Sequence, residues 1–166
     1  CYYRRPAFTC ELYRPVKDKV MDDLMLRIRS RFNTTLVTQQ EAIRFLLRKY
    51  RSNEQFLVGF ISDQRPNSQN LHNWTQFLHQ DTAFAVGGEE IGQHVNAHYF
   101  FLHVEKPQRG HYVMTFKEVC PQDDKTKFPY TLQYLRMMEE NIRKQPELWL
   151  WSHNRWKFDR EGKAIH

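Results

Sequence analysis

Several features that would identify an enzyme class or a cellular location are missing from this chain of 166 residues. Its three cysteines form no CxxC pair and no metal-type spacing, which disfavours a disulfide framework and indicates a reducing compartment. No apolar run reaches the roughly 18 residues that span a bilayer, and no signal peptide is visible. An HExxH motif, a GxSxG elbow and a P-loop lysine are also lacking. We therefore expect neither a metal nor a cofactor.

The composition that is present fits a folded, basic protein. Hydrophobic residues make up 40% of the chain and charged residues 27%, which is typical of a globular protein. The length suits a single domain over residues 1–166. The net charge of +6 favours an anionic partner, and charge alone leaves nucleic acid, a phospholipid surface and a phosphorylated substrate open.

The segment 146–157 has the most unusual composition. Three of the four tryptophans, Trp149, Trp151 and Trp156, fall within eight residues. Among them lie three side chains that are or can become cationic: His153, Arg155 and Lys157. Such a mixture suits a membrane headgroup zone or an anionic ligand cleft. The alternation around Leu150 cannot direct every side chain into one core, so part of the cluster is expected to be exposed or to line a cleft.

Strands and helices are expected to alternate through much of the chain. The expected strands are 8–13, 34–37, 56–61, 98–104 and 111–119, and the expected helices are 17–31, 38–50, 82–97 and 130–145. This order indicates an α/β fold, with a layered, largely parallel sheet flanked by helices.

Four local expectations are specific enough to test. The apolar run 56–61 is typical of a strand covered on both faces. Residues 67–80 are expected to form a long polar loop, followed by a helix whose glycines allow a close approach to another backbone or a ligand. Thr38 and Glu41 have the spacing of a capping box.

Asp63 follows directly after the apolar strand. A carboxylate there can orient a histidine or bind a cation, or it can simply cap a turn. Arg14, Arg29 and Arg31 can form a phosphate clamp, because guanidinium groups match phosphate oxygens in pairs. The two helical arginines also lie where cations favour the C-terminal helix dipole, which is the simpler interpretation. The pair Gly87-Gly88 is a poor phosphate loop and is better explained by close packing.

Six motifs follow one another along the chain: Tyr13-Arg14-Pro15, Arg29-Ser30-Arg31, Gly59-Phe60-Ile61-Ser62-Asp63-Gln64, Asp81-Thr82-Ala83-Phe84 with Gly87, Arg109-Gly110-His111-Tyr112, and Trp149-Leu150-Trp151-Ser152-His153-Asn154-Arg155-Trp156-Lys157. In this order they resemble the lipid A biosynthesis acyltransferases, the lauroyl/myristoyl branch of the lysophospholipid acyltransferase superfamily, over about residues 12–157. The resemblance is closest to Bacteroidetes-type members, and it implies the glycerolipid acyltransferase-like form of the α/β fold.

The resemblance implies transfer of a fatty acyl group from acyl carrier protein or acyl-CoA to a glycolipid hydroxyl in lipopolysaccharide biosynthesis. It places the protein at the cytoplasmic face of the bacterial inner membrane. The resemblance implies three roles for site residues. Catalysis is supported by Asp63 and Gln64. Substrate is bound by Arg14, Arg29, Arg31, His153 and Arg155, and lipid is faced by Trp149, Trp151 and Trp156.

One departure from the family pattern is plain. The family's general base is the histidine of a His-x4-Asp/Glu motif, and no histidine of this chain has Asp or Glu five residues later. Since the chain begins with Cys1 rather than Met, we expect it to be the C-terminal part of the catalytic domain. The motif is expected upstream, and the fragment alone is expected to be inactive.

Two other functions remain open on the sequence. A catalytically degenerate member would bind lipid or another anion without acyl transfer. A nucleic-acid-binding module agrees with the charge, but the cations are spread along the chain and no RNP, KH or helix-turn-helix signature is present. We therefore do not expect a nucleic-acid partner.

Overall fold

Residues 8–122 and 125–165 are described by the computed structural model, whose contacts divide the chain into two units, Cys1–Ile61 and Ser62–His166. The first unit has parallel strands joined by helices, and the second has two antiparallel hairpins with helices. Each unit is described by itself. No helix among these described residues is long and apolar enough to cross a membrane.

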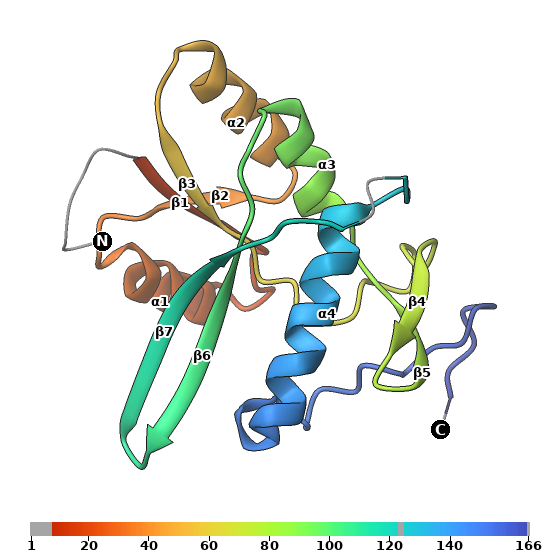
Figure 1. The fold of residues 1–166 in the computed structure, drawn as a ribbon. Coiled ribbons are helices and arrows are strands. Elements are labelled where there is room, and N and C mark those ends of the chain that lie inside the picture. The colour runs from red at the N-terminus through yellow and green to blue at the C-terminus, as the bar shows by residue number, and fades with distance from the viewer. Residues whose placement is uncertain (1–7, 123–124, 166) are drawn as a thin grey trace. The chain divides into compact units, whose positions relative to one another are not determined.

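A three-stranded parallel sheet organises the first unit. Strand β1 (Phe8–Tyr13) is central, with β2 (Thr35–Thr38) on one side and β3 (Phe56–Gly59) on the other. Parallel neighbours require crossover connections, which are supplied by α1 (Lys19–Ser30) and α2 (Ala42–Arg51) (Figure 1). The α/β class with a parallel sheet is therefore confirmed.

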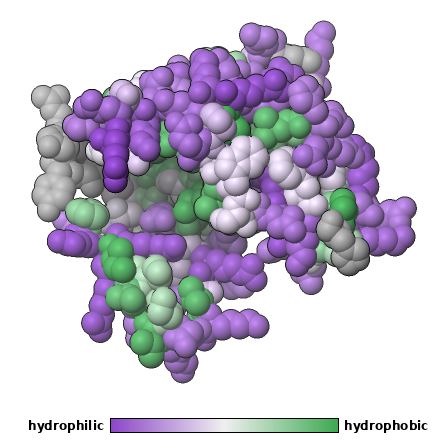
Figure 2. Space-filling view, turned by 90° about the horizontal axis from the view of Figure 1, so that it is seen from below, coloured by the Kyte–Doolittle hydropathy of each residue, from purple (hydrophilic) through white to green (hydrophobic). Residues whose placement is uncertain are grey.

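The first helix is correctly placed by its periodicity, but its apolar face is not buried. The Asp18 side chain caps it by accepting a hydrogen bond from the Met21 amide at 2.9 Å. Val20, Leu24 and Ile28 recur on one face, yet they are 78%, 47% and 53% exposed. Apolar side chains of this kind reach the surface of the molecule at several places (Figure 2).

Two expectations about the first unit are wrong. The predicted strand 56–61 ends at Gly59, and its face is not covered on both sides, since Leu57 is 47% exposed. The physical reason is that β3 pairs only with β1 in the described sheet, at its edge. The capping box is absent, because α2 begins after Glu41 and the Thr38 hydroxyl donates to the Glu41 carboxylate instead.

The second unit begins with a hairpin where a loop was expected. Strands β4 (Trp74–Phe77) and β5 (Gln80–Ala83) pair antiparallel through the turn residues Leu78 and His79, which have φ of 50° and 63°. Such turns normally use Asn or Gly, so the sequence carries no signal for this one. The helix expected over 82–97 is consequently shorter, because α3 spans Gly87–His94.

The remaining elements were predicted closely. Strands β6 (Phe100–Gln108) and β7 (His111–Glu118) form the expected hairpin, and α4 (Pro129–Lys144) is followed by the 3-10 turn η1 (Pro146–Leu148). The core of this unit consists of buried side chains from the hairpins, α4 and the segments between them: Phe77, Phe84, Phe101, Val119, Phe128, Leu135, Met138 and Ile142.

Helix α3 joins the other elements of the second unit through close contacts. A Cβ at Gly92 would collide with the Tyr99 ring, so this glycine allows close approach of a side chain and not of the backbone or ligand that was expected. A Cβ at Gly87 would meet nothing within 4 Å, so close packing does not explain that glycine. The buried Glu89 carboxylate accepts hydrogen bonds from the amides of Tyr130 and Thr131 at 3.3 and 2.8 Å. The Thr131 hydroxyl donates a third bond to it at 2.6 Å. Glu89 therefore caps the N-terminus of α4 from another helix.

Candidate functional site

Two segments without helix or strand structure lie together in the second unit, and they carry the residues that the sequence singled out. The segment 63–66 follows β3, and the segment 153–156 lies in the tryptophan-rich ending. Arg155 Nη1 donates to the main-chain carbonyl of Asp63 at 2.5 Å. In return, Arg65 donates its amide to His153 Nε2 at 3.2 Å and its Nε to the Asn154 carbonyl at 3.1 Å. Residues 92 positions apart thus form one site.

Arg155 occupies the interior of this site. It is only 4% exposed, and its guanidinium carbon lies 4.8 Å from the centroid of the Phe77 ring. Burial lowers the pKa of Arg155 from its ordinary value, while nearby Tyr134 and Asp63 act in the opposite direction. Cation–π contact and the bond to a carbonyl offset part of the cost of desolvating the guanidinium.

The Asp63 carboxylate is the acidic group of the site. Its Oδ1 atom is buried and makes no hydrogen bond with the described residues, and the same holds for Nε of Arg155. Burial raises the pKa of Tyr134 to about 12, with a further rise caused by Asp63 and a reduction caused by Arg155. The Tyr134 phenol is therefore neutral at physiological pH. The Asp63 carboxylate has one oxygen, Oδ1, that can still accept a hydrogen bond.

His153 is held in one tautomer. Because Nε2 accepts from the Arg65 amide, the ring proton of the neutral form lies on Nδ1. Burial, then Arg65 and Arg155, lower the pKa of His153 below its ordinary value, while Asp63 acts to raise it. The neutral ring is thus favoured, and it can donate one hydrogen bond from Nδ1.

The tryptophan cluster separates into packed and exposed members. Trp149 is half-buried, with its ring centroid 6.2 Å from that of Phe77. Trp156 is also half-buried and donates Nε1 to the Thr82 hydroxyl at 2.8 Å. Trp151 is 55% exposed. The expectation that part of the cluster is exposed is confirmed, while a lipid-facing role for the three rings stays a prediction.

Gln64 and three arginines complete the set of predicted site residues. Gln64 is exposed beside Asp63. Arg14, Arg29 and Arg31 belong to the first unit, where Arg14 follows β1 and the other two lie at the end of α1. The Arg31 guanidinium carbon lies 5.9 Å from the Phe32 ring centroid. Substrate binding by these arginines stays a prediction.

Two members of the site could not be identified from the sequence. Phe77 was expected in a loop, and Tyr134 is one of many residues in a regular helix. Neither has a motif around it, and both are recognised only from their position next to Arg155.

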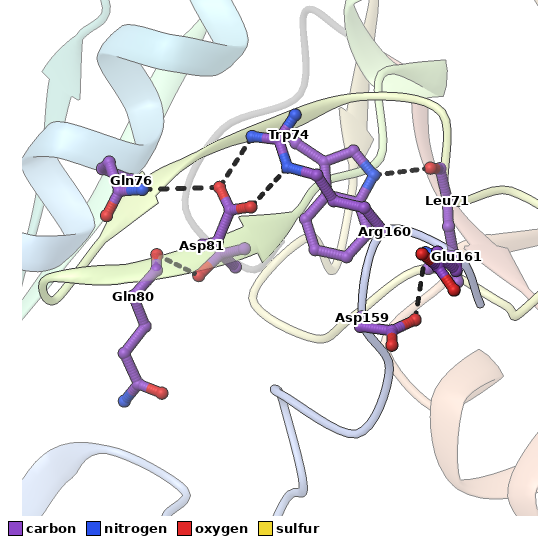
Figure 3. Close-up of polar contacts among 9 residues, drawn as sticks. Leu71, Trp74, Gln76, Gln80, Asp81, Asp159, Arg160 and Glu161 are labelled. Carbon is purple, nitrogen blue, oxygen red and sulfur yellow. Dashed lines mark hydrogen bonds and ion pairs between the residues drawn. The ribbon is translucent and has the colours of Figure 1, made fainter. Parts of the chain in front are cut away.

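A second polar cluster holds the end of the chain against the β4–β5 hairpin (Figure 3). Arg160 donates to both carboxylate oxygens of Asp81, one of them at 2.8 Å, and its guanidinium carbon lies 5.5 Å from the Trp74 ring centroid. Hydrogen bonding to Arg160 lowers the pKa of Asp81. The Arg160 and Asp81 side chains pair with each other and are 64% and 40% exposed, so they form a surface anchor.

Within the described ranges, no group of three or more His, Cys, Asp or Glu side chains could hold a metal ion. Cys10 is buried and Cys120 is exposed, and both are free thiols.

Comparison with known proteins relates the chain to a family of enzymes. A family model described as bacterial lipid A biosynthesis acyltransferase matches residues 3–158, a range that contains both the Asp63 and the Arg155 segments. No curated protein matches the chain.

Proposed function

The chain belongs to the bacterial lipid A biosynthesis acyltransferase family, and from this premise we propose that the protein transfers a fatty acyl chain to a hydroxyl of a glycolipid acceptor, such as a lipid A precursor. The acyl donor is acyl carrier protein or acyl-CoA. The reaction takes place at the cytoplasmic face of the bacterial inner membrane. Family membership supports acyl transfer in general, and the donor, acceptor and location are the further content of the proposal.

The observation that carries the proposal is the set of hydrogen bonds between the Asp63 and Arg155 segments. Both segments had been assigned to the site from the family resemblance. Their direct contact, across 92 positions of sequence, is what a shared site requires. It supports a working role for these residues more strongly than either motif alone.

The chemistry is an exchange of one ester for another. The acceptor hydroxyl loses its proton to a general base and attacks the thioester carbonyl, which forms a tetrahedral intermediate. An oxygen–carbon bond forms, the carbon–sulfur bond breaks, and the thiol leaves with a proton. Asp63 supports this step, because its carboxylate can accept a hydrogen bond from a protonated base or a hydroxyl. Gln64 assists it.

Substrate binding falls to the cationic and aromatic residues. Arg14, Arg29 and Arg31 contact phosphate groups of the acceptor, for which guanidinium is well suited. The exposed Trp151 meets the lipid or the membrane surface, because an indole ring favours the boundary between apolar and wet regions.

The test is an activity assay on the product of the complete gene. We expect acyl transfer to a lipid A precursor from acyl carrier protein or CoA thioesters, detected by mass spectrometry of the lipids. Asp63→Asn should lower the rate by about 10-fold or more, whereas Asp23→Asn, an exposed carboxylate on α1, should leave it unchanged.

Other outcomes identify the alternatives. Lipid binding without product from any donor would favour a catalytically degenerate member. Binding to DNA or RNA that weakens steeply with salt, without affinity for lipid or acyl carrier protein, would favour a nucleic-acid module.

A further inference from the structure

We propose that Arg155 is a positioning residue that acts through Asp63: it holds the main chain of Asp63 so that the carboxylate is presented to the reacting groups. This role differs from the substrate binding expected of Arg155 from the sequence. The inference rests on the proposed function, since the positioned group is the carboxylate that supports acyl transfer.

Arg155 is buried too deeply to be a good binding group for a large substrate. At 4% exposure, its guanidinium has little surface to offer a bulky anionic headgroup. Its Nη1 is already used, because it donates to the Asp63 carbonyl at 2.5 Å. This cation is therefore turned toward the main chain of the proposed supporting residue and not toward solvent.

The aromatic ring that Arg155 packs against is held rigidly. Its guanidinium carbon lies 4.8 Å from the ring centroid of Phe77, which is 1% exposed and sits in strand β4. A ring so deeply packed cannot shift without opening the core. Arg155 thus connects a fixed ring to a segment that has no helix or strand bonds of its own.

Arg155 is not the only connection between the segments 63–66 and 153–156. The Arg65 amide donates to His153, and the Arg65 side chain donates to the Asn154 carbonyl. With these bonds intact, loss of the Arg155 contact should leave the segment attached but let Asp63 move. The expected damage is to geometry at the reacting groups, where a displacement of about 1 Å can cost on the order of 100-fold in rate.

The charge of Arg155 alone does not explain the arrangement. A lysine would keep the positive charge but has a single ammonium on a flexible stem, and it lacks the planar group that lies near the ring while donating to a carbonyl. Arg155→Lys therefore separates positioning from charge.

The experiment measures kcat and KM of the complete enzyme with one acyl donor and one acceptor for wild type, Arg155→Lys, Asp63→Asn and the double variant. Arg160→Lys is the matched control, because Arg160 is also stacked on an aromatic ring but bonds Asp81 at the surface. Assays are run well below each variant's melting temperature and corrected for the folded fraction.

We expect Arg155→Lys to lower kcat by about 10- to 100-fold with KM changed less than about twofold. In the Asp63→Asn background it should cause less than about a twofold further loss, because there is no carboxylate left to position. Arg160→Lys should leave kcat unchanged. Amide hydrogen exchange at Arg65 should stay as slow as in wild type in both variants, because its bond to His153 keeps the segment attached.

If Arg155→Lys lowers kcat equally with and without the Asp63 carboxylate, the positioning role is wrong. A folded Arg155→Lys enzyme with wild-type kcat would also overturn it. Both results would leave the proposed function intact. An inactive wild-type enzyme would overturn the proposed function itself. If Arg155→Lys does not fold, His153→Asn, which alters the neighbouring bond to Arg65, takes its place in the same cycle and must show the same dependence on Asp63.

Discussion

Replacing Glu89 by glutamine should destabilise the second unit although the residue is outside the proposed site. The Glu89 side chain is 3% exposed, and its two oxygens accept from the Tyr130 amide, the Thr131 amide and the Thr131 hydroxyl. In Glu89→Gln, one oxygen becomes an NH₂ group that cannot accept from the donors facing it.

The magnitude follows from these contacts. Losing one hydrogen bond to a charged acceptor costs about 1.5–3 kcal/mol, and losing a negative charge at a helix N-terminus costs about 0.3–1 kcal/mol. Removing a buried charge also removes its desolvation cost, which places the net loss near the lower end, at about 2 kcal/mol. A urea m value of about 1–2 kcal/mol per M converts this loss into a midpoint shift of about 1–2 M.

Tryptophan fluorescence during urea unfolding is a suitable assay, because all four tryptophans lie in the second unit. The matched control is Glu90→Gln, which changes the exposed neighbour on the same helix and should shift the midpoint little. Equal midpoints for Glu89→Gln and wild type, with unchanged m, would refute the assignment of Glu89 as the cap of α4.

Three further predictions concern single side chains. Because the pKa of His153 is lowered in the folded state, the unfolded chain binds the proton more readily. The contribution of His153 to stability is therefore full above about pH 6.5 and declines as the pH falls below that value. The difference in urea midpoint between wild type and His153→Asn should shrink from pH 8 to pH 5.5. Gly92→Ala should lose about 1–3 kcal/mol of stability by calorimetry, since the new methyl would displace the Tyr99 ring, and Tyr99→Ala should abolish most of that difference. Cys120 should react with a thiol reagent in the native protein while Cys10, whose pKa is raised to about 11 by burial, should not; mass-spectrometric mapping that finds Cys10 labelled as fast as Cys120 would contradict this.

Hydrophobic periodicity and end residues were sufficient to predict several of the helices and strands. The strand at Phe8–Tyr13, the helix capped by Asp18 and the long helix ending at Lys144 all follow from hydrophobic spacing and end residues. The hairpin at Leu78 and His79 could not be found this way, because its positive φ angles fall on residues that rarely adopt them.

Some residues of the candidate site could be predicted from the sequence, but Phe77, Tyr134 and the arrangement of the site could not. Motif resemblance selected Asp63 and Arg155 separately, and no local rule could show that one donates to the carbonyl of the other. The burial of Arg155 against Phe77 depends on long-range packing, which spacing does not contain. For the same reason, the sequence could not tell the packed Trp156 from the exposed Trp151.

The bond from Arg155 to Asp63 also has a consequence for the order of events during synthesis. Protein chains grow from the N-terminus at about 5–20 residues per second, so the 92 positions between these residues correspond to roughly 5–18 s of translation. Throughout that interval the Asp63 segment lacks its partner. The contact is therefore completed only after Arg155 has been synthesised, and a chain that stops before Arg155 would carry the Asp63 motif without this hydrogen bond.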